Sequence, residues 1–112
     1  MDINEAADLV EKREQNAMNA ITIDCVIFGF DKGSLEVLLI QHGEGISKGK
    51  WGLSGGWIYK KESTDNAAHR LLNELTGLDN IYLEQLKAFG DPDRFPLRRV
   101  ITIGYYALVK RE

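Results

Sequence analysis

The sequence has little cysteine, no excess of basic residues and no long apolar run. Its single cysteine, Cys25, cannot support an internal disulfide framework, so the chain is not a disulfide-stabilised scaffold. Cys25 lies within the apolar run 21–28. We therefore expect a small buried side chain in a reducing compartment.

The charge balance and the hydrophobic pattern exclude two further classes. The chain has 14 Lys and Arg against 17 Asp and Glu, a net charge of -3, so a nucleic-acid-binding surface cannot extend over the whole chain. No apolar run approaches the roughly 18–20 residues that span a bilayer, and the acidic N-terminus is unlike a signal peptide. We expect a cytoplasmic protein that has no membrane partner.

The length of 112 residues predicts one folded domain. Residues 3–18 have a loosely amphipathic helical pattern, which suits either a solvated arm or a dimer contact. We therefore divide the chain into an N-terminal helical arm, residues 1–20, and a domain at 21–112. We found no internal repeat, low-complexity stretch or interdomain linker.

Apolar and β-branched runs predict strands at 21–30, 35–41, 81–89 and 100–109. Asp31, Lys32 and Gly33 separate the first two strands and indicate a hairpin. A helix is expected at 63–76, between the two pairs of strands. This order predicts an α/β layered domain with a mixed sheet.

Residues 56–78 contain a long pattern of fixed spacing, and its members are Gly56, Glu62, Arg70, Leu72, Glu74, Gly77 and Leu78. The pattern resembles the box of the Nudix superfamily, with Leu71 and Leu75 where the family has glutamates. The resemblance implies an α/β/α sandwich with a mixed sheet. Typical members continue for another strand and a helix, so we expect the C-terminal part of the fold to be missing from this chain.

The two replaced glutamates matter because positions 71, 74 and 75 share one face of a helix. Three carboxylates there would hold Mg²⁺, which prefers oxygen ligands. With leucines at 71 and 75, Glu74 and Glu62 remain as metal ligands and as residual catalytic candidates. We expect a weak or absent metal site, no catalytic residue and no cofactor, with Mg²⁺ needed only by a hydrolase.

Loss of a positioned general base typically lowers a rate by about 10²–10⁴-fold, and the family's water-activating acid is often at position 71. Efficient diphosphate hydrolysis is therefore not expected. The alternative is that Asp91, Asp93 or Glu84 has taken over this role.

Arg94, Arg98 and Arg99 lie in one segment and are candidates for binding a phosphate, a carboxylate or sugar hydroxyls, for which the guanidinium fork is suited. In the other interpretation they pair with nearby acids. Trp51 and Trp57 flank the glycines before the helix; their rings stack on a ligand or pack under the loop.

The remaining box residues are predicted to be structural. In the family, Glu62 and Arg70 form an ion pair that fixes the loop before the helix, and we expect that role here. Gly55, Gly56 and Gly77 provide backbone shapes that a side chain would hinder.

The segments 24–30 and 100–108, together with the degenerate box, resemble Nudix-related transcription regulators of the nicotinamide- or arabinose-responsive type. The resemblance implies a catalytically impaired domain that senses ADP-ribose or a sugar, a homodimer, and DNA binding only through a C-terminal winged helix domain missing from this chain. The alternative is a Mg-dependent Nudix hydrolase of nucleoside diphosphate derivatives. A partner-binding domain is the third hypothesis.

Overall fold

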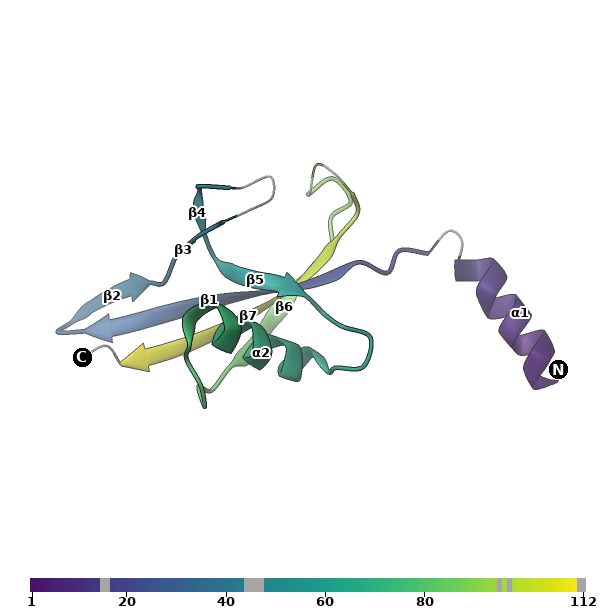
Figure 1. Ribbon diagram of the computed structural model, residues 1–112, viewed down its shortest axis with the longest axis horizontal. Coiled ribbons are helices and arrows are strands. Elements are labelled where there is room, and N and C mark those ends of the chain that lie inside the picture. Colours follow the sequence, from purple (N-terminus) through teal and green to yellow (C-terminus); the bar gives the residue numbers. More distant parts are fainter. Residues whose placement is uncertain (15–16, 44–47, 95, 97, 111–112) are drawn as a thin grey trace.

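The computed structural model describes residues 1–14, 17–43, 48–94, 96 and 98–110. Figure 1 shows a main sheet with a helix against it, a short pair of strands beside it and another helix at the N-terminus. The elements are α1 (Ile3–Glu14), β1 (Ile21–Asp31), β2 (Ser34–Val37), β3 (Ile40–Gln41), β4 (Trp51–Gly52), β5 (Ser54–Trp57), α2 (Thr64–Thr76), β6 (Glu84–Phe89) and β7 (Ile101–Lys110).

β1 is the centre of a mixed five-stranded sheet. It pairs in parallel with β7 along ten residues and antiparallel with β2 and β5, while β6 pairs antiparallel with β7. β5 occupies the first half of β1 and β2 the second half. The α/β class with a mixed sheet, predicted from the sequence, is confirmed.

Side chains of β1 alternate between the two faces of the sheet, as a strand requires. Ile23, Cys25 and Ile27 are buried in the core beneath α2. Thr22 and Asp24 point to the opposite face and are partly buried. The sheet therefore has one apolar face for packing and one face with polar groups.

α2 begins and ends with well-formed caps. The Ser63 hydroxyl accepts a hydrogen bond from the backbone N–H of Asn66 at 3.0 Å, and Gly77 closes the helix with a φ of 76°, a conformation that glycine adopts without strain. Ala67, Ala68, Leu71 and Leu72 form the buried face of α2. Cys25 packs against this face and is buried, as predicted from the sequence. Burial raises the pKa of its thiol to about 11.

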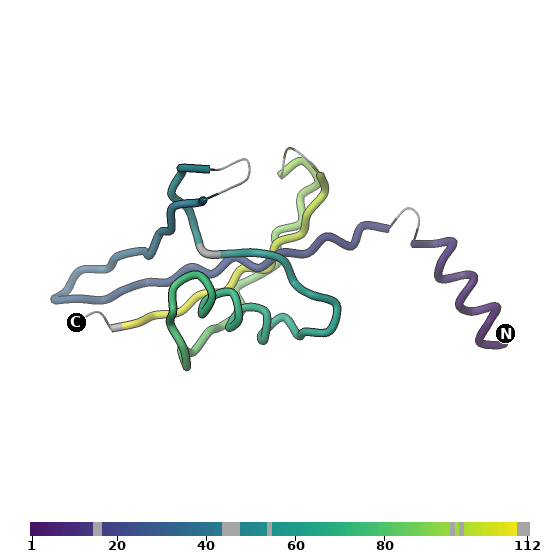
Figure 2. Tube along the Cα trace, viewed as in Figure 1, coloured from purple at the N-terminus to yellow at the C-terminus, as the bar shows by residue number. Residues whose placement is uncertain are grey.

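The hairpin predicted at 31–33 is present, since Lys32 and Gly33 both have positive φ between β1 and β2. α1 extends away from the sheet in Figures 1 and 2. The radius of gyration is accordingly 17.4 Å, against about 13 Å for a compact domain of this length. No helix among the described residues is long and apolar enough to cross a membrane.

Candidate functional site

Arg70 organises the loop that joins β5 to α2. Its Nε and Nη2 donate to the two carboxylate oxygens of Glu62 at 2.9 and 2.6 Å, and Nη2 also donates to the Trp57 carbonyl at 2.8 Å. The guanidinium lies 4.1 Å from the centre of the Tyr59 ring, and the backbone N–H of Tyr59 donates to Glu62. These contacts tie both ends of the loop to one helical side chain.

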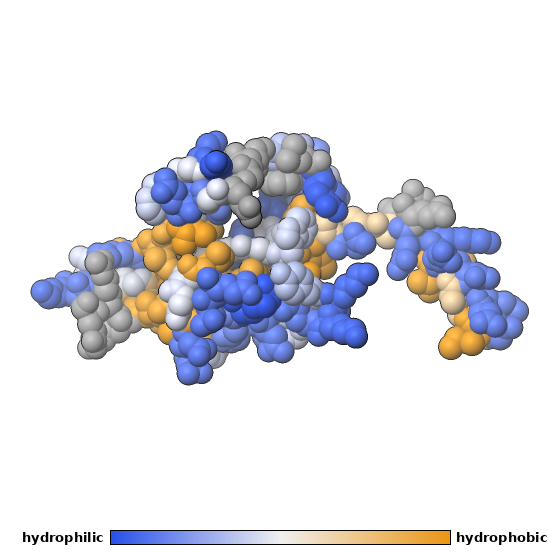
Figure 3. All heavy atoms as spheres, viewed as in Figure 1, coloured by the Kyte–Doolittle hydropathy of each residue, from blue (hydrophilic) through white to orange (hydrophobic). Residues whose placement is uncertain are grey.

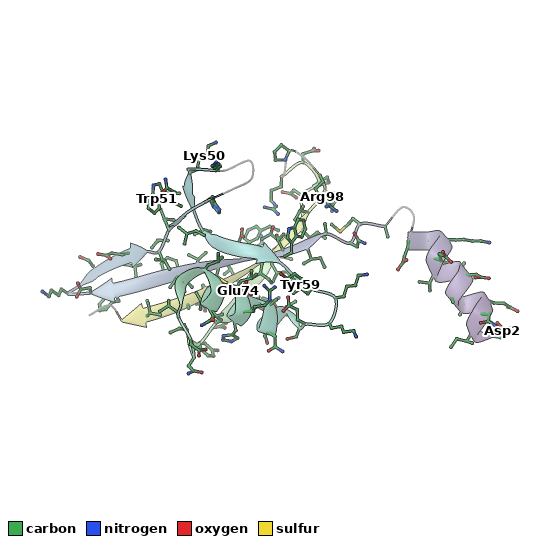
Figure 4. All side chains as sticks on the ribbon, in the orientation of Figure 1. Asp2, Lys50, Trp51, Tyr59, Glu74 and Arg98 are labelled. Atoms are coloured by element: carbon green, nitrogen blue, oxygen red, sulfur yellow. The ribbon has the colours of Figure 1, made fainter. Side chains whose placement is uncertain are left out.

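The two glutamates predicted as residual metal ligands are both bound to this arginine. Glu74 accepts from Arg70 Nη1 at 3.2 Å and Glu62 accepts the paired bonds; Figure 4 shows Glu74 and Tyr59 on the same side of β5. Hydrogen bonds from Arg70 and from the Tyr59 backbone lower the pKa of Glu62. Both retained carboxylates therefore bind the helical arginine, Glu62 through its two oxygens and the exposed Glu74 through one.

Leucines occupy the other positions that a metal site would need. Leu71 is 5% exposed and packs against Gly56, where an added Cβ would lie 2.6 Å from a Leu71 methyl carbon; Leu75 is 41% exposed. Apolar side chains supply no ligand for Mg²⁺. The residues present at the box helix do not fit a magnesium site.

The acids considered as replacements for the missing glutamates lie on β6 and in the segment that follows it. Glu84 accepts a hydrogen bond from the Tyr106 hydroxyl at 2.8 Å, and Asp91 and Asp93 are exposed in the segment after β6. Within the part of the chain that the structure describes, no group of three His, Cys, Asp or Glu residues is placed to hold a metal ion.

The polar face of the sheet contains a second candidate site. A hollow of about 220 Å³ is lined by Thr22, Asp24, Gly56, Trp57, Arg94, Val100 and Thr102. The Arg94 Nη2 donates to the Thr102 hydroxyl and to the Val100 carbonyl, and the Thr22 and Thr102 hydroxyls are hydrogen-bonded at 2.8 Å. The guanidinium is thus fixed over the strands, and its other N–H groups donate to none of the residues that the structure describes.

Three of the five predicted ligand-binding residues gather here. Trp57 and Arg94 line the same hollow, and the Arg98 guanidinium lies 5.5 Å from the centre of the Trp57 ring. Arg99 instead donates to the Gly90 carbonyl at 2.9 Å and closes its own loop. Trp51 lies apart from Arg98, on the β3–β4 hairpin (Figure 4).

A second hollow of about 240 Å³ adjoins the first and is mainly apolar. It shares Asp24, Arg94 and Thr102 with its neighbour and adds Val26, Leu53, Leu86, Phe89 and Gly104. The two hollows together form a site with a cationic, aromatic end, a polar middle and an apolar end.

Sequence reasoning missed Asp24, Thr22 and Thr102. The available signal was an aspartate inside an otherwise apolar strand, since a buried polar residue is more informative than a buried apolar one. The parallel register that sets Thr102 beside Thr22 joins residues far apart in the sequence, and no local pattern reveals it.

A larger hollow, of about 500 Å³, is mostly apolar and lies elsewhere. Its lining includes Ile27, Val37, Leu39, Leu78 and Val109. Figure 3 shows apolar side chains near the C-terminal end of α2, whereas the outward face of this helix is hydrophilic. The volume of a hollow therefore does not distinguish the polar site, which is smaller than this apolar hollow.

Comparisons with known proteins give a consistent result. The family model of the NUDIX domain matches residues 18–112. The ADPR responsive transcriptional repressor NtrR of Acinetobacter baylyi is 38% identical over 91 residues, which are 80% of this chain and 36% of that protein. The chain thus spans about a third of the length of this curated relative.

Solved structures agree with the sequence relatives. The NUDIX domain of Shewanella oneidensis NrtR in complex with ADP ribose is 30% identical with a TM-score of 0.85, covering 100% of this chain and 73% of that one. Shewanella oneidensis NrtR in complex with a 27mer DNA is 36% identical with a TM-score of 0.71, covering 79% and 41%.

Proposed function

The chain belongs to the NUDIX domain family, and from this premise we propose that it is a ligand-sensing domain of a transcription regulator that binds ADP-ribose without efficient hydrolysis. A fold alone does not assign a chemistry, so the proposal depends on the site. The related repressor is ADPR responsive, and a related NUDIX domain was solved with ADP ribose.

One observation carries the proposal: the box keeps its scaffold and has leucines, Leu71 and Leu75, in place of two of the family's glutamates. Arg70 engages both Glu62 and Glu74, and Leu71 fills the space against Gly56. A hydrolase that positions Mg²⁺ needs several free oxygens at this helix. The geometry supports binding rather than bond cleavage.

The hollow on the polar face suits the proposed ligand. Arg94 and Arg98 offer guanidinium donors, which pair well with phosphate oxygens. Trp57 presents an aromatic ring at the same hollow, suited to a sugar or base. ADP-ribose carries a diphosphate, two pentoses and a purine, which suit the cationic, polar and apolar parts of the two adjoining hollows.

Calorimetric titration of the 112-residue chain with ADP-ribose, with and without Mg²⁺, tests the proposal, together with an assay of diphosphate cleavage. We expect binding in both conditions and no turnover. Cleavage at ordinary enzyme rates would assign the chain to the Mg-dependent hydrolases. Binding of arabinose but not of ADP-ribose would identify the domain as a sugar sensor. Binding of neither compound would favour a partner-binding domain.

DNA binding belongs, in this proposal, to a domain outside these 112 residues, because the chain has a net charge of -3 and DNA contacts require clustered cations.

A homodimer stays a prediction. α1 has no buried residue, and Ile3 and Val10 are exposed on it. Sedimentation equilibrium of the chain with and without residues 1–20 measures whether this arm contributes to association.

A further inference from the structure

Asp24 is a carboxylate in the middle of a sheet, at the boundary between the two adjoining hollows. Its position on β1 is opposite Gly55 on β5, and a Cβ at Gly55 would collide with the Asp24 carboxylate. The same Cβ would lie 2.5 Å from the Ile23 carbonyl oxygen, so the close approach of β5 to β1 and the Asp24 side chain both require a glycine at position 55.

No hydrogen bond to the Asp24 carboxylate is formed by the residues that the structure describes, and no ion pair within 4.0 Å reaches it from them. Burial raises the pKa of Asp24, and the charges of Arg94 and His42 oppose this rise. A partly buried carboxylate without donors is unfavourable for folding. A hydrogen-bond donor brought by a ligand in the two hollows would offset this cost.

Arg94 and Asp24 line both hollows together without forming an ion pair within 4.0 Å, although the charge of Arg94 lowers the pKa of Asp24. A site with a cation beside an anionic acceptor suits a ligand that brings both acceptors and donors. Phosphate oxygens supply the acceptors, and the vicinal hydroxyls of a ribose supply the donors. The apolar hollow next to Phe89 then accommodates a group without charge.

We propose that Asp24 accepts hydrogen bonds from ribose hydroxyls of the bound nucleotide, between a phosphate held at Arg94 and the purine in the hollow beside Phe89. This assignment rests on the proposed function, binding of ADP-ribose, and names the residue that recognises the sugar. Two carboxylate oxygens match two neighbouring hydroxyls, and a deoxy sugar would leave the anion without a donor.

The test combines one side-chain change with one ligand change. Wild type, Asp24→Asn and the control Asp31→Asn, the same substitution at the far end of β1, are titrated calorimetrically with ADP-ribose and with analogues lacking the 2-hydroxyl of either ribose. Because the assigned sugar lies between a phosphate and the purine, we expect wild type and Asp31→Asn to bind the analogue lacking the 2′-hydroxyl of the adenosine ribose about 10- to 100-fold more weakly than ADP-ribose. Asp24→Asn should bind ADP-ribose weakly and discriminate little between the ligands.

Each other outcome overturns a defined part of this assignment. If wild type fails to bind ADP-ribose, the proposed function falls and the assignment falls with it. If wild type binds but Asp24→Asn keeps full affinity and full discrimination, the function stands and the role of Asp24 is refuted. Thermal unfolding separates folding from recognition: a melting temperature of Asp24→Asn well below wild type would give Asp24 a structural role instead.

Discussion

Arg70 and Glu62 are eight residues apart in the chain and are joined by two parallel hydrogen bonds of 2.9 and 2.6 Å. The planar fork of an arginine makes such a pair, and a lysine ammonium does not reproduce it. The pair also brings Glu62 within reach of the Tyr59 backbone. One side-chain contact therefore sets the path of the whole β5–α2 loop.

Replacement of this arginine tests that role. Arg70→Lys keeps the positive charge and loses the paired geometry and the bond to the Trp57 carbonyl, so we expect the unfolding midpoint to fall by a few degrees. Arg13→Lys, in the exposed α1, is the matched control. Equal midpoints for the two variants in thermal denaturation would show that the fork does not stabilise the loop.

The hydrogen bonds of Glu62 predict how the stability of the fold changes at acidic pH. Because the pKa of Glu62 in the folded state lies below the ordinary value, its contribution to stability is present above the unfolded-state pKa and is lost as pH falls through the folded-state pKa. Glu62→Gln should therefore flatten the fall of stability on the acid side of about pH 4.5. Urea unfolding of both chains across this pH range measures the difference.

Close packing between β5 and α2 makes Gly56 hard to replace. Gly56→Ala would set its Cβ 2.6 Å from a Leu71 methyl carbon, and overpacking of this kind costs about 1–3 kcal/mol. Gly43→Ala, where no atom of the described residues beyond the chain neighbours lies within 4 Å of the added carbon, should change the free energy of unfolding little. Adding Leu71→Ala to Gly56→Ala should cost less than the sum of the two single changes, since they share one contact.

The sequence predicted the elements better than the contacts between them. The apolar and β-branched run at 21–30 and the box pattern that places a helix at 63–76 are local signals, and the structure contains both elements. Local patterns also predicted a strand at 35–41, whereas β2 ends at Val37 and a separate β3 begins at Ile40, because its pairing partner changes from β1 to β4. Tertiary pairing decided this boundary.

Prediction of the site from the sequence was limited in the same way, because the site depends on strand pairing. The arginines and tryptophans were visible as residue types, but the hollow that unites Trp57 with Arg94 depends on how β1, β5 and β7 pair. The same pairing separates Arg99, which bonds within its loop, from Arg98, which lies over Trp57. Spacing along one segment does not distinguish these outcomes.

Restoring the family's glutamates tests the interpretation of the box helix. Leu75→Glu changes a half-exposed position and should alter stability by about 0.5–1 kcal/mol, whereas Leu71→Glu buries a carboxylate and should cost roughly 2–4 kcal/mol. The double variant should gain affinity for Mg²⁺ beside Glu74 in calorimetry. The matched control is the pair of glutamines at both positions, which lack the charge; equal Mg²⁺ binding by the two double variants would contradict the placement of these residues on one metal-binding face.

Asp24 should give stability a dependence on pH opposite to that of Glu62. Burial raises its folded-state pKa, so the folded chain binds more protons than the unfolded one between pH 3.8 and that pKa, and this residue lowers stability as pH rises through the window. Asp24→Asn removes the ionisation, so its stability relative to wild type should be smallest in acid, increase with pH and level off above the folded-state pKa. Urea unfolding of wild type and Asp24→Asn at a series of pH values measures this difference. A constant difference across the series would mean that the Asp24 carboxylate is not desolvated, and the energetic argument for a ligand donor would then be lost.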